Sequence, residues 1–518
     1  MAGVEHRVCD ASDLAEGAMR PVELDGRKLL LARVDGACHA IGGTCPHAGG
    51  PLAEGVLHGG VVICPWHKAA FRIATGARVE PPAVDDLPAF PVRVVDGRVL
   101  VTVDDEPERV DPAPMVGGAD RRCFAIVGAG AAGAVAAQVL REEGFAGRVV
   151  LISREDRLPY DRTVLSKYAL SGTQGGEKSP LQDEAFYARH GIERMAREVA
   201  RLDAASRTIT FADGTALAYD AALVATGGTP RPFKVPGAEL ANVFLLRVAA
   251  DAERIAAVAA GARRAVVAGA GFIAVEAAAS LRERGLEVTV VAPTAAPFER
   301  QLGTEIGNAF RRLHERKGVA FRLGQEIAAV EGDGRVREVV LRDGSRLPAD
   351  LIVAGLGIAP ATDFLRDVER REDGGVAVDA RLRAAEALFA AGDIAAFPLR
   401  GDGPAVRVEH WRVAEQHGRV AALNMLGRGA SYDAVPYFWT IHFKKRLDYV
   451  GHAAPGDEVV VDGDLERPEF IACYLRDGRV TAVAGWDRDR QMAAAIHLMT
   501  ERRDWTRAGL CDALRGWA

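Results

Sequence analysis

The pattern of apolar and polar positions divides this chain of 518 residues into three stretches. Up to residue 104, short apolar runs between Gly and Asp turns predict a small antiparallel sandwich or barrel, with strands at 28–34, 61–64, 90–95 and 99–103. Between residues 122 and about 430, apolar strands alternate with helical patterns, which indicates α/β units. Further strands are expected at 436–443, 458–461, 470–475 and 480–485, followed by a helix at 489–501.

Residues 105–121 separate the first two stretches. They are acidic at first, then rich in Pro and Gly, and have no apolar period. Such a composition predicts a semi-extended linker at a domain boundary. The linker would keep the N-terminal module at a high effective concentration beside the rest of the chain.

A strand, a glycine turn and a helix follow one another at the start of the middle stretch. The apolar run 124–127 ends in a G-x-G-x-x-G motif, and a helix is expected over 131–142. The motif glycines are Gly128, Gly130 and Gly133. Such a turn lets the backbone approach a diphosphate, which the helix N-terminus binds through free N–H groups and its dipole. Glu155, just beyond a strand at 149–153, stands where a carboxylate would accept a hydrogen bond from a ribose hydroxyl.

The same arrangement occurs a second time. A strand at 264–268 leads into Gly269 and Gly271, and we expect a helix over 272–284 and a strand over 287–292. These features predict a second diphosphate cradle.

A second repeat supports duplication. The stretches 220–230 and 350–360 are both buried strands that end in a Gly turn and a Pro at the same spacing. We therefore expect two Rossmann-like units, one inserted in the other. Asp393 follows a strand at 387–391, where its carboxylate can accept from a sugar-chain hydroxyl.

The N-terminal stretch carries a C-x-H motif and, 16 residues later, a C-x-x-H motif. The four residues are Cys45, His47, Cys64 and His67. Two thiolates can hold one iron and two imidazoles the other, which describes a Rieske [2Fe–2S] centre. A Cys₂His₂ zinc site is the alternative, but zinc motifs usually group two cysteines in one half and two histidines in the other. We interpret Cys9, Cys38 and His58 as ordinary residues.

Composition narrows the partners and the compartment. The net charge is −6 without a basic block, which argues against nucleic acid or an anionic membrane surface as a partner. The uncharged stretch 123–140 contains three glycines and a glutamine, so it is a poor membrane span. No apolar leader is visible at the start, and seven cysteines are too sparse for a disulfide scaffold. We expect a cytoplasmic protein.

As a set, these motifs resemble the flavoprotein reductases that bind two dinucleotides, in particular ferredoxin reductases of the putidaredoxin-reductase kind and apoptosis-inducing-factor-like proteins with an N-terminal Rieske domain. The resemblance implies a multidomain fold: a Rieske-type β domain, two nested Rossmann-like domains and a C-terminal α+β reductase domain. The expected domains are 1–104 (Rieske), 105–121 (linker), 122–245 and 366–430 (FAD-binding), 246–365 (NAD(P)-binding) and 431–518 (reductase C-terminal).

The resemblance also implies which residues bind each cofactor. FAD would be held by the first cradle, Glu155, Arg162 and Asp393, and NAD(P)H by Gly269 and Gly271. Lys167 resembles the lysine that approaches the flavin ring, and Glu276 resembles its carboxylate partner. A solvated lysine and a helix-face glutamate are the alternative.

The sequence leaves two questions open: the role of Trp439 and the choice of nicotinamide cofactor. Trp439 would shield one flavin face or pack in the core. The choice between NADH and NADPH is also open, because the strand at 287–292 ends without an acid and Arg300 is near in sequence. The resemblance leans to NADH.

The N-terminal stretch resembles low-potential Rieske ferredoxin domains. Gly50 and Trp66 stand where high-potential members carry a disulfide, so we expect a midpoint near roughly −150 mV. Lys68 stands where a glycine is more usual.

These features predict an NAD(P)H-dependent reductase with its ferredoxin built in. No cysteine lies between Cys123 and Cys473, so no thiol pair can relay electrons from the flavin. Electrons would pass from NAD(P)H through FAD to the [2Fe–2S] cluster and leave for an unidentified acceptor through an exposed histidine-ligated iron. The alternative is a redox-sensing or signalling flavoprotein of the apoptosis-inducing-factor kind, with slow turnover.

Overall fold

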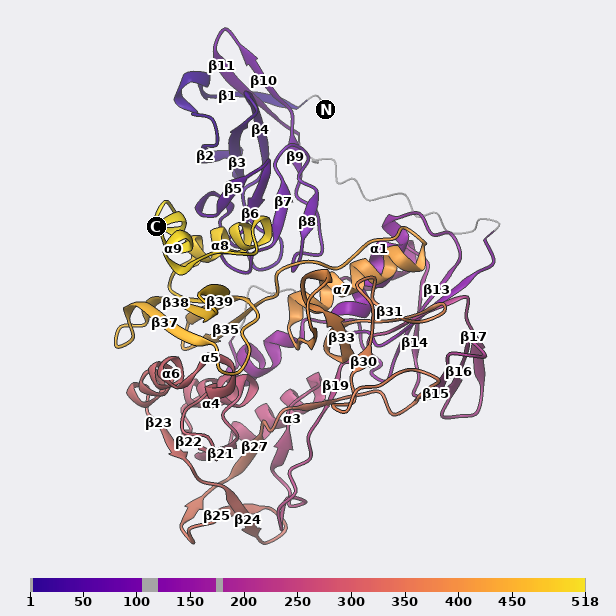
Figure 1. The fold of residues 1–518 in the computed structure, drawn as a ribbon, viewed down its shortest axis with the longest axis vertical. Coiled ribbons are helices and arrows are strands. Elements are labelled where there is room, and N and C mark those ends of the chain that lie inside the picture. Colours follow the sequence, from indigo (N-terminus) through magenta and orange to yellow (C-terminus); the bar gives the residue numbers. More distant parts are fainter. Residues whose placement is uncertain (1–2, 105–119, 174–179, 518) are drawn as a thin grey trace.

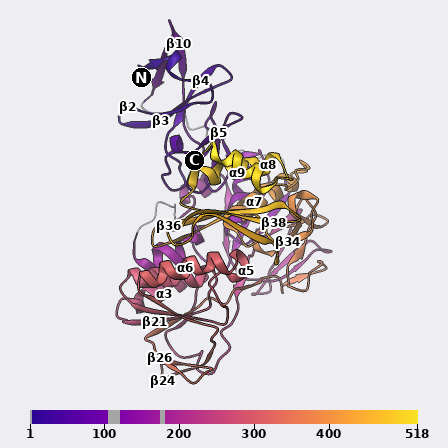
Figure 2. The ribbon, with the colours of Figure 1, turned by 60° about the vertical axis from the view of Figure 1, so that its left-hand side comes forward.

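The computed structural model describes residues 3–104, 120–173 and 180–517. The predicted linker at 105–121 lies outside the described residues except at its last two positions. In Figures 1 and 2, the N-terminal module (residues 3–104) forms one end of the molecule and strands β24–β26 lie at the other. Among the described residues, no helix is both long and apolar enough to cross a membrane.

The N-terminal module consists of three small antiparallel sheets, ordered β1-β11-β10, β2-β3-β4-β9 and β5-β6-β7-β8. Its strands are β1 (Val4–Asp10), β2 (Met19–Leu24), β3 (Arg27–Val34), β4 (Ala37–Gly42), β5 (Val56–His58), β6 (Val61–Ile63), β7 (Ala70–Arg72), β8 (Arg78–Glu80), β9 (Ala89–Phe90), β10 (Val92–Val95) and β11 (Arg98–Val103). Two short 3₁₀ turns cover Ala11–Asp13 and Leu52–Glu54. The ligand loops precede β5 and β7, so the small third sheet positions the Cys/His motifs.

The first α/β domain is built on a sheet ordered β14-β13-β12-β18-β32-β31, parallel except at its β31 edge. The strands are β12 (Cys123–Val127), β13 (Arg148–Ser153), β14 (Ile192–Ala196), β18 (Ala221–Val224), β31 (Arg383–Ala385) and β32 (Leu388–Ala390). Helices α1 (Ala131–Glu142) and α7 (Trp411–Met425) share a core beside it. A Cβ at Gly418 would lie 2.2 Å from the Ala132 carbonyl oxygen, so glycine allows the two helices to cross closely.

The second α/β domain repeats the plan with a parallel sheet ordered β20-β27-β21-β22-β23. Its strands are β20 (Val243–Leu245), β21 (Arg264–Ala268), β22 (Glu287–Ala292), β23 (Val319–Leu323) and β27 (Leu351–Ala354), and its helices are α3 (Ala249–Ala259), α4 (Phe272–Glu283), α5 (Glu299–Leu302) and α6 (Thr304–Arg316). The predicted repeat has a structural counterpart. Asp220 accepts a hydrogen bond from the Cys123 N–H at the start of β12, and Asp350 accepts from the Arg264 N–H at the start of β21. Strands β19 (Gly228–Pro230) and β28 (Ile358–Pro360) then pair with each other and join the two domains.

Small sheets and turns complete the two α/β domains. The additional strands are β15 (Val199–Asp203), β16 (Thr208–Phe211), β17 (Ala216–Ala218), β24 (Ile327–Gly332), β25 (Val336–Leu341), β26 (Arg346–Pro348), β29 (Leu365–Arg366), β30 (Val376–Ala377), β33 (Ala395–Pro398) and β34 (Ala405–Arg407). The short helical elements are α2 (Glu184–Arg189), 3₁₀ turns at Arg162–Val164, Gly392–Ile394 and Leu399–Gly401, and a π-helical turn at Leu165–Ala169.

The C-terminal domain (residues 431–517) has a five-stranded antiparallel sheet ordered β35-β36-β39-β38-β37. Its elements are β35 (Tyr437–His442), β36 (Lys445–Gly451), β37 (Glu458–Asp464), β38 (Glu469–Arg476), β39 (Arg479–Trp486), α8 (Asp489–Glu501) and α9 (Arg507–Arg515). Helices α8 and α9, yellow in Figure 1, lie directly against the N-terminal module.

The N-terminal module docks on the rest of the protein through a shared core. Val56, Ile63 and Ala70 of this module belong to the same buried cluster as Tyr437 and Ile496 of the C-terminal domain. Polar contacts extend the interface onto α1 and α7: Arg78 with Glu142, Gln138 with the Val84 carbonyl, and Arg412 with the Pro81 carbonyl. Burial of apolar surface therefore holds the module in one place.

Candidate functional site

The structure brings the four predicted cluster ligands together. The Nδ1 atoms of His47 and His67 lie 3.1 Å apart, and the thiols of Cys45 and Cys64 contact each other as a hydrogen-bonded pair. Contact with Cys64 and burial raise the pKa of Cys45. Burial would also raise the pKa of Cys64, but hydrogen bonds from Cys45 and from the backbone of Trp66 and His67 lower it to about 7. Two sulfurs on one side and two ring nitrogens on the other fit a Rieske-type [2Fe–2S] cluster.

The ligand loops leave room only for glycine at one position. A Cβ at Gly50 would lie 2.8 Å from the Cys64 sulfur and 3.3 Å from the Trp66 ring. The Cys45 N–H donates to the Gly50 carbonyl and closes this loop. Gly50 and Trp66 thus face each other, but neither can form a disulfide.

The expectation of an exposed histidine-ligated iron is wrong. His47 and His67 are only 7% and 4% exposed, because their rings face the remainder of the protein. The His67 ring lies 4.6 Å from that of Trp439, centroid to centroid, and His47 Nε2 lies 3.7 Å from Asp161 Oδ2. Exposure of a ligand depends on how domains dock, and the pattern along the chain does not show docking.

Lys68, next to the last ligand, links the cluster loop to the C-terminal domain. Its backbone is left-handed (φ 62°), a conformation that favours glycine, and its side chain is 0% exposed. The ammonium donates to Asp448 Oδ2 (2.8 Å) and to the Pro65 carbonyl (2.5 Å). Burial lowers the pKa of Lys68, and the Asp448 carboxylate opposes that shift. The lysine that replaces the more usual glycine at position 68 therefore forms a buried ion pair between the two domains.

The first glycine cradle has the geometry that the motif predicts. Gly128 has a φ of 112°, and a Cβ there would lie 2.2 Å from the Ala225 carbonyl oxygen. A Cβ at Gly133 would lie 1.8 Å from the Gly128 carbonyl oxygen, whereas one at Gly130 would meet only Arg162 Nε at 4.0 Å. The turn is tight on the protein side and open on the side where a diphosphate would bind.

The other predicted FAD residues surround this cradle. Arg162 and Tyr160 both donate to the Glu155 carboxylate, at 2.6 and 2.8 Å. Asp393 pairs with Arg247 at 3.3 Å. Glu155 and Arg162 are thus paired with each other, which sequence spacing did not indicate.

The second cradle resembles the first. Gly269 has a φ of 106°, and a Cβ there would lie 2.4 Å from the Gly355 carbonyl oxygen. A Cβ at Gly271 would meet nothing within 4 Å. The open side again fits a bound diphosphate.

Lys167 and Glu276 form a buried ion pair of 3.3 Å between the two α/β domains. Lys167 lies in the π-helical turn, a feature often found at functional sites, and donates to the Thr163 carbonyl at 2.8 Å. Glu276 also accepts from the hydroxyls of Ser166 (2.5 Å) and Thr440 (2.7 Å). The alternative of a solvated lysine does not hold.

Strand β35 connects this pair to the cluster ligands. Thr440 contacts Glu276, while its neighbour Trp439 contacts His67, so adjacent residues reach the two sites. Trp439 is buried, and its Nε1 has no hydrogen-bond partner among the described residues. His410, before α7, is half-buried, and loss of solvent around its ring lowers its pKa to about 3. A pKa in this range favours a structural role for His410 over that of a proton donor.

Comparison with known families settles the class. Residues 123–418 match the model of the pyridine nucleotide-disulphide oxidoreductases. The chain belongs to this family. Residues 4–91 match the Rieske [2Fe-2S] domain and residues 437–515 the reductase C-terminal domain.

Individual relatives of the family agree. Apoptosis-inducing factor 3 of Homo sapiens is 38% identical over 515 residues, which cover 96% of this chain and 84% of the relative. The ferredoxin reductase component of chlorobenzene dioxygenase from Cupriavidus sp. is 37% identical and covers 75% of this chain and 95% of its own length. The putidaredoxin reductase–putidaredoxin covalent complex superposes with a TM-score of 0.72 at 28% identity, covering 76% of this chain and 99% of that one.

Membership in the family establishes the cofactors and the reaction class. The chain is a ferredoxin-reductase-like oxidoreductase that acts on NAD(P)H, with FAD and a Rieske-type [2Fe–2S] cluster. The predicted fold class is confirmed. The assignment of individual residues to these cofactors stays a prediction, which the geometry above supports.

Sequence reasoning missed several residues of the site. Asp161 directly precedes Arg162, but nothing in the sequence indicated that Asp161 would reach His47. Thr440 and Asp448 gave no local signal, because their partners are 164 and 380 residues away in the chain.

Proposed function

We propose that this oxidoreductase takes electrons from NAD(P)H and delivers them through FAD to its own Rieske cluster, and from there to an external acceptor. The observation that carries the proposal is the burial of His47 and His67 against Asp161 and Trp439. Asp161 and Trp439 lie on the two segments that also carry Lys167 and Thr440. The cluster end of the N-terminal module therefore faces the two segments that would line the flavin in this proposal.

Each cofactor has its own set of residues. FAD would be held by Gly128, Gly130, Gly133, Glu155, Arg162, Lys167 and Asp393; NAD(P)H by Gly269 and Gly271; and the cluster by Cys45, His47, Cys64 and His67. When bound, FAD supplies the exchange between two-electron and one-electron chemistry that nicotinamides and iron–sulfur clusters require.

Lys167 provides a fixed positive charge. Its ammonium is held by Glu276 and the Thr163 carbonyl, so it does not have to reorient when negative charge develops nearby. Preorganised charge of this kind stabilises an electron-rich ring better than mobile water does. Glu276 is a positioning residue in this proposal.

Trp439 closes the space between the C-terminal domain and the cluster ligands. Its indole lies 4.6 Å from the His67 ring and 6.1 Å from the His47 ring. A buried aromatic contact excludes water from the gap between the two redox centres. Because the histidines are covered, the acceptor would approach the other side of the ligand loops, where Gly49 is exposed and Trp66 is half-buried.

Anaerobic rapid mixing with NADH, followed separately at flavin and cluster wavelengths, tests the proposal. In the wild type, the flavin should be reduced first and the cluster afterwards. Trp439→Leu should leave flavin reduction unchanged and slow cluster reduction, whereas Trp517→Leu, a control in the same domain, should slow neither. A cluster that stays oxidised while the flavin is fully reduced would refute the proposal. Sluggish turnover with artificial acceptors and a long-lived charge-transfer band would favour the redox-sensing alternative.

A further inference from the structure

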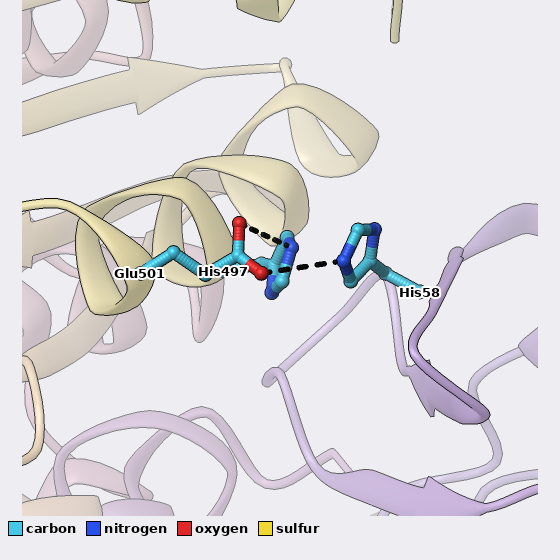
Figure 3. Close-up of side chains that lie close together, drawn as sticks. All are labelled: His58, His497 and Glu501. Atoms are coloured by element: carbon cyan, nitrogen blue, oxygen red, sulfur yellow. Dashed lines mark ion pairs between the residues drawn. The ribbon is translucent and has the colours of Figure 1, made fainter.

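Three ligand-type side chains meet where the N-terminal module touches helix α8, away from the cluster and the two cradles. His58 ends β5 of the N-terminal module, and His497 and Glu501 lie one turn apart on α8 (Figure 3). Positions four apart on a helix face the same side, so both α8 residues point toward His58. The sequence alone had left His58 without a role.

The distances suit a single metal ion. The Glu501 carboxylate pairs with both imidazoles: its Oε1 lies 3.3 Å from His58 Nε2 and its Oε2 lies 3.2 Å from His497 Nε2 (Figure 3). Metal–ligand bonds of about 2.0–2.2 Å at tetrahedral angles put neighbouring ligand atoms about 3.3 Å apart. One ligand atom from each residue lies within 4.8 Å of the others, so only small side-chain rotations are needed.

The backbone around the three side chains is firmly held. Val56 and Ile496, close to His58 and His497 in the chain, belong to the core shared by the two domains. A site whose ligands project from packed elements loses little entropy on binding a metal. The imidazole rings already lie 3.7 Å apart, centroid to centroid.

We propose that His58, His497 and Glu501 bind one divalent transition-metal ion, for which Zn²⁺ is the best match. Two imidazoles and one carboxylate are a common zinc ligand set, with a fourth position left for water. The partial exposure of all three side chains gives the ion a path from solvent. Because the ligands come from two domains, the bound ion crosslinks the N-terminal module to the C-terminal domain. Binding to the docked form alone would stabilise that form.

Equilibrium dialysis of the holoprotein against Zn²⁺, with zinc and iron both measured, tests the proposal. The wild type should retain one zinc per chain at unchanged iron content. His58→Gln, His497→Gln and Glu501→Gln should each weaken binding more than about tenfold, since even loss of an outer-shell partner typically costs that much. His6→Gln is the matched control, because His6 pairs with the surface carboxylate of Asp25 and belongs to no group of three ligand-type side chains among the described residues.

A second measurement tests whether the bound ion stabilises the docked form of the N-terminal module. Zn²⁺ should raise the temperature at which the cluster absorbance is lost in the wild type and in His6→Gln, but not in Glu501→Gln. No zinc retained at constant iron content, or equal retention by the ligand variants and the control, would overturn the proposal.

Discussion

Lys68→Met tests how the N-terminal module is held on the body of the protein. The substitution removes a fully buried ammonium from Asp448 and from the Pro65 carbonyl, while an apolar chain of similar length remains. Breaking one side of a buried ion pair costs about 3–5 kcal/mol, because the remaining charge is left unpaired. Arg446, also close to Asp448 at 3.4 Å, would offset part of that cost.

This free-energy cost should weaken the docking of the N-terminal module on the C-terminal domain rather than destabilise the core of either domain. At 1.4 kcal/mol per factor of ten, a loss of about 3 kcal/mol reduces the ratio of docked to undocked forms roughly a hundredfold. We therefore expect the cluster absorbance to be lost at a lower temperature. Cluster reduction by NADH should slow, while flavin reduction keeps the wild-type rate.

Two further variants separate the loss of the buried ion pair from the loss of a lysine in the C-terminal domain and from the backbone conformation at position 68. Lys445→Met removes a partly exposed cation from Asp487 in the same domain and should cost at most about 1 kcal/mol. Lys68→Gly also loses the ion pair and relieves the left-handed backbone, which is worth about 1 kcal/mol, but it empties the space of a fully buried side chain at a cost of about 2–5 kcal/mol, so it should be less stable than Lys68→Met. Wild-type melting and wild-type cluster reduction in Lys68→Met would refute the reasoning.

The remaining predictions concern the cradles and two buried carboxyls. Gly133→Ala places a Cβ 1.8 Å from the Gly128 carbonyl oxygen and should abolish FAD retention, measured as flavin per chain. Gly271→Ala meets no protein atom, so flavin content should stay normal while KM for NAD(P)H rises at least about tenfold; an unchanged KM would place the nucleotide elsewhere. Glu276→Gln should slow flavin reduction by NADH up to about a hundredfold in rapid mixing, and an unchanged rate would remove its positioning role. Burial raises the pKa of Glu415 above its ordinary 4.5, so above that pH only the unfolded chain ionises and stability falls as pH rises. Glu415→Gln should therefore gain about 1.4 kcal/mol over the wild type per pH unit up to the folded pKa, and parallel melting curves across pH would contradict this.

Local features of the fold were predictable because their causes are local. The apolar run of β12, the glycine turn and helix α1 lie within twenty residues, and the helix begins and ends where the pattern places it, at Ala131–Glu142. The duplicated strands at 220–230 and 350–360 likewise predict the two Rossmann-like units. Their first residues, Asp220 and Asp350, accept hydrogen bonds at the starts of the equivalent strands β12 and β21. Spacing and residue type alone singled out the four predicted cluster ligands, and the structure brings them together.

Contacts between domains were not predictable in this way. The pairing of Lys68 with Asp448 joins positions 380 residues apart, and neither residue belongs to a periodic pattern. The same limit explains the wrong expectation for the histidine ligands, which are covered by Trp439 and Asp161 from other domains. The midpoint near roughly −150 mV stays a prediction.

Electron paramagnetic resonance of the protein after anaerobic titration with NADH tests the central claim most directly. The account predicts that NADH alone produces the rhombic signal of a reduced Rieske cluster, and that Cys64→Ser lacks the signal while its flavin is still reduced. A signal that appears only with dithionite, never with NADH, would contradict the account.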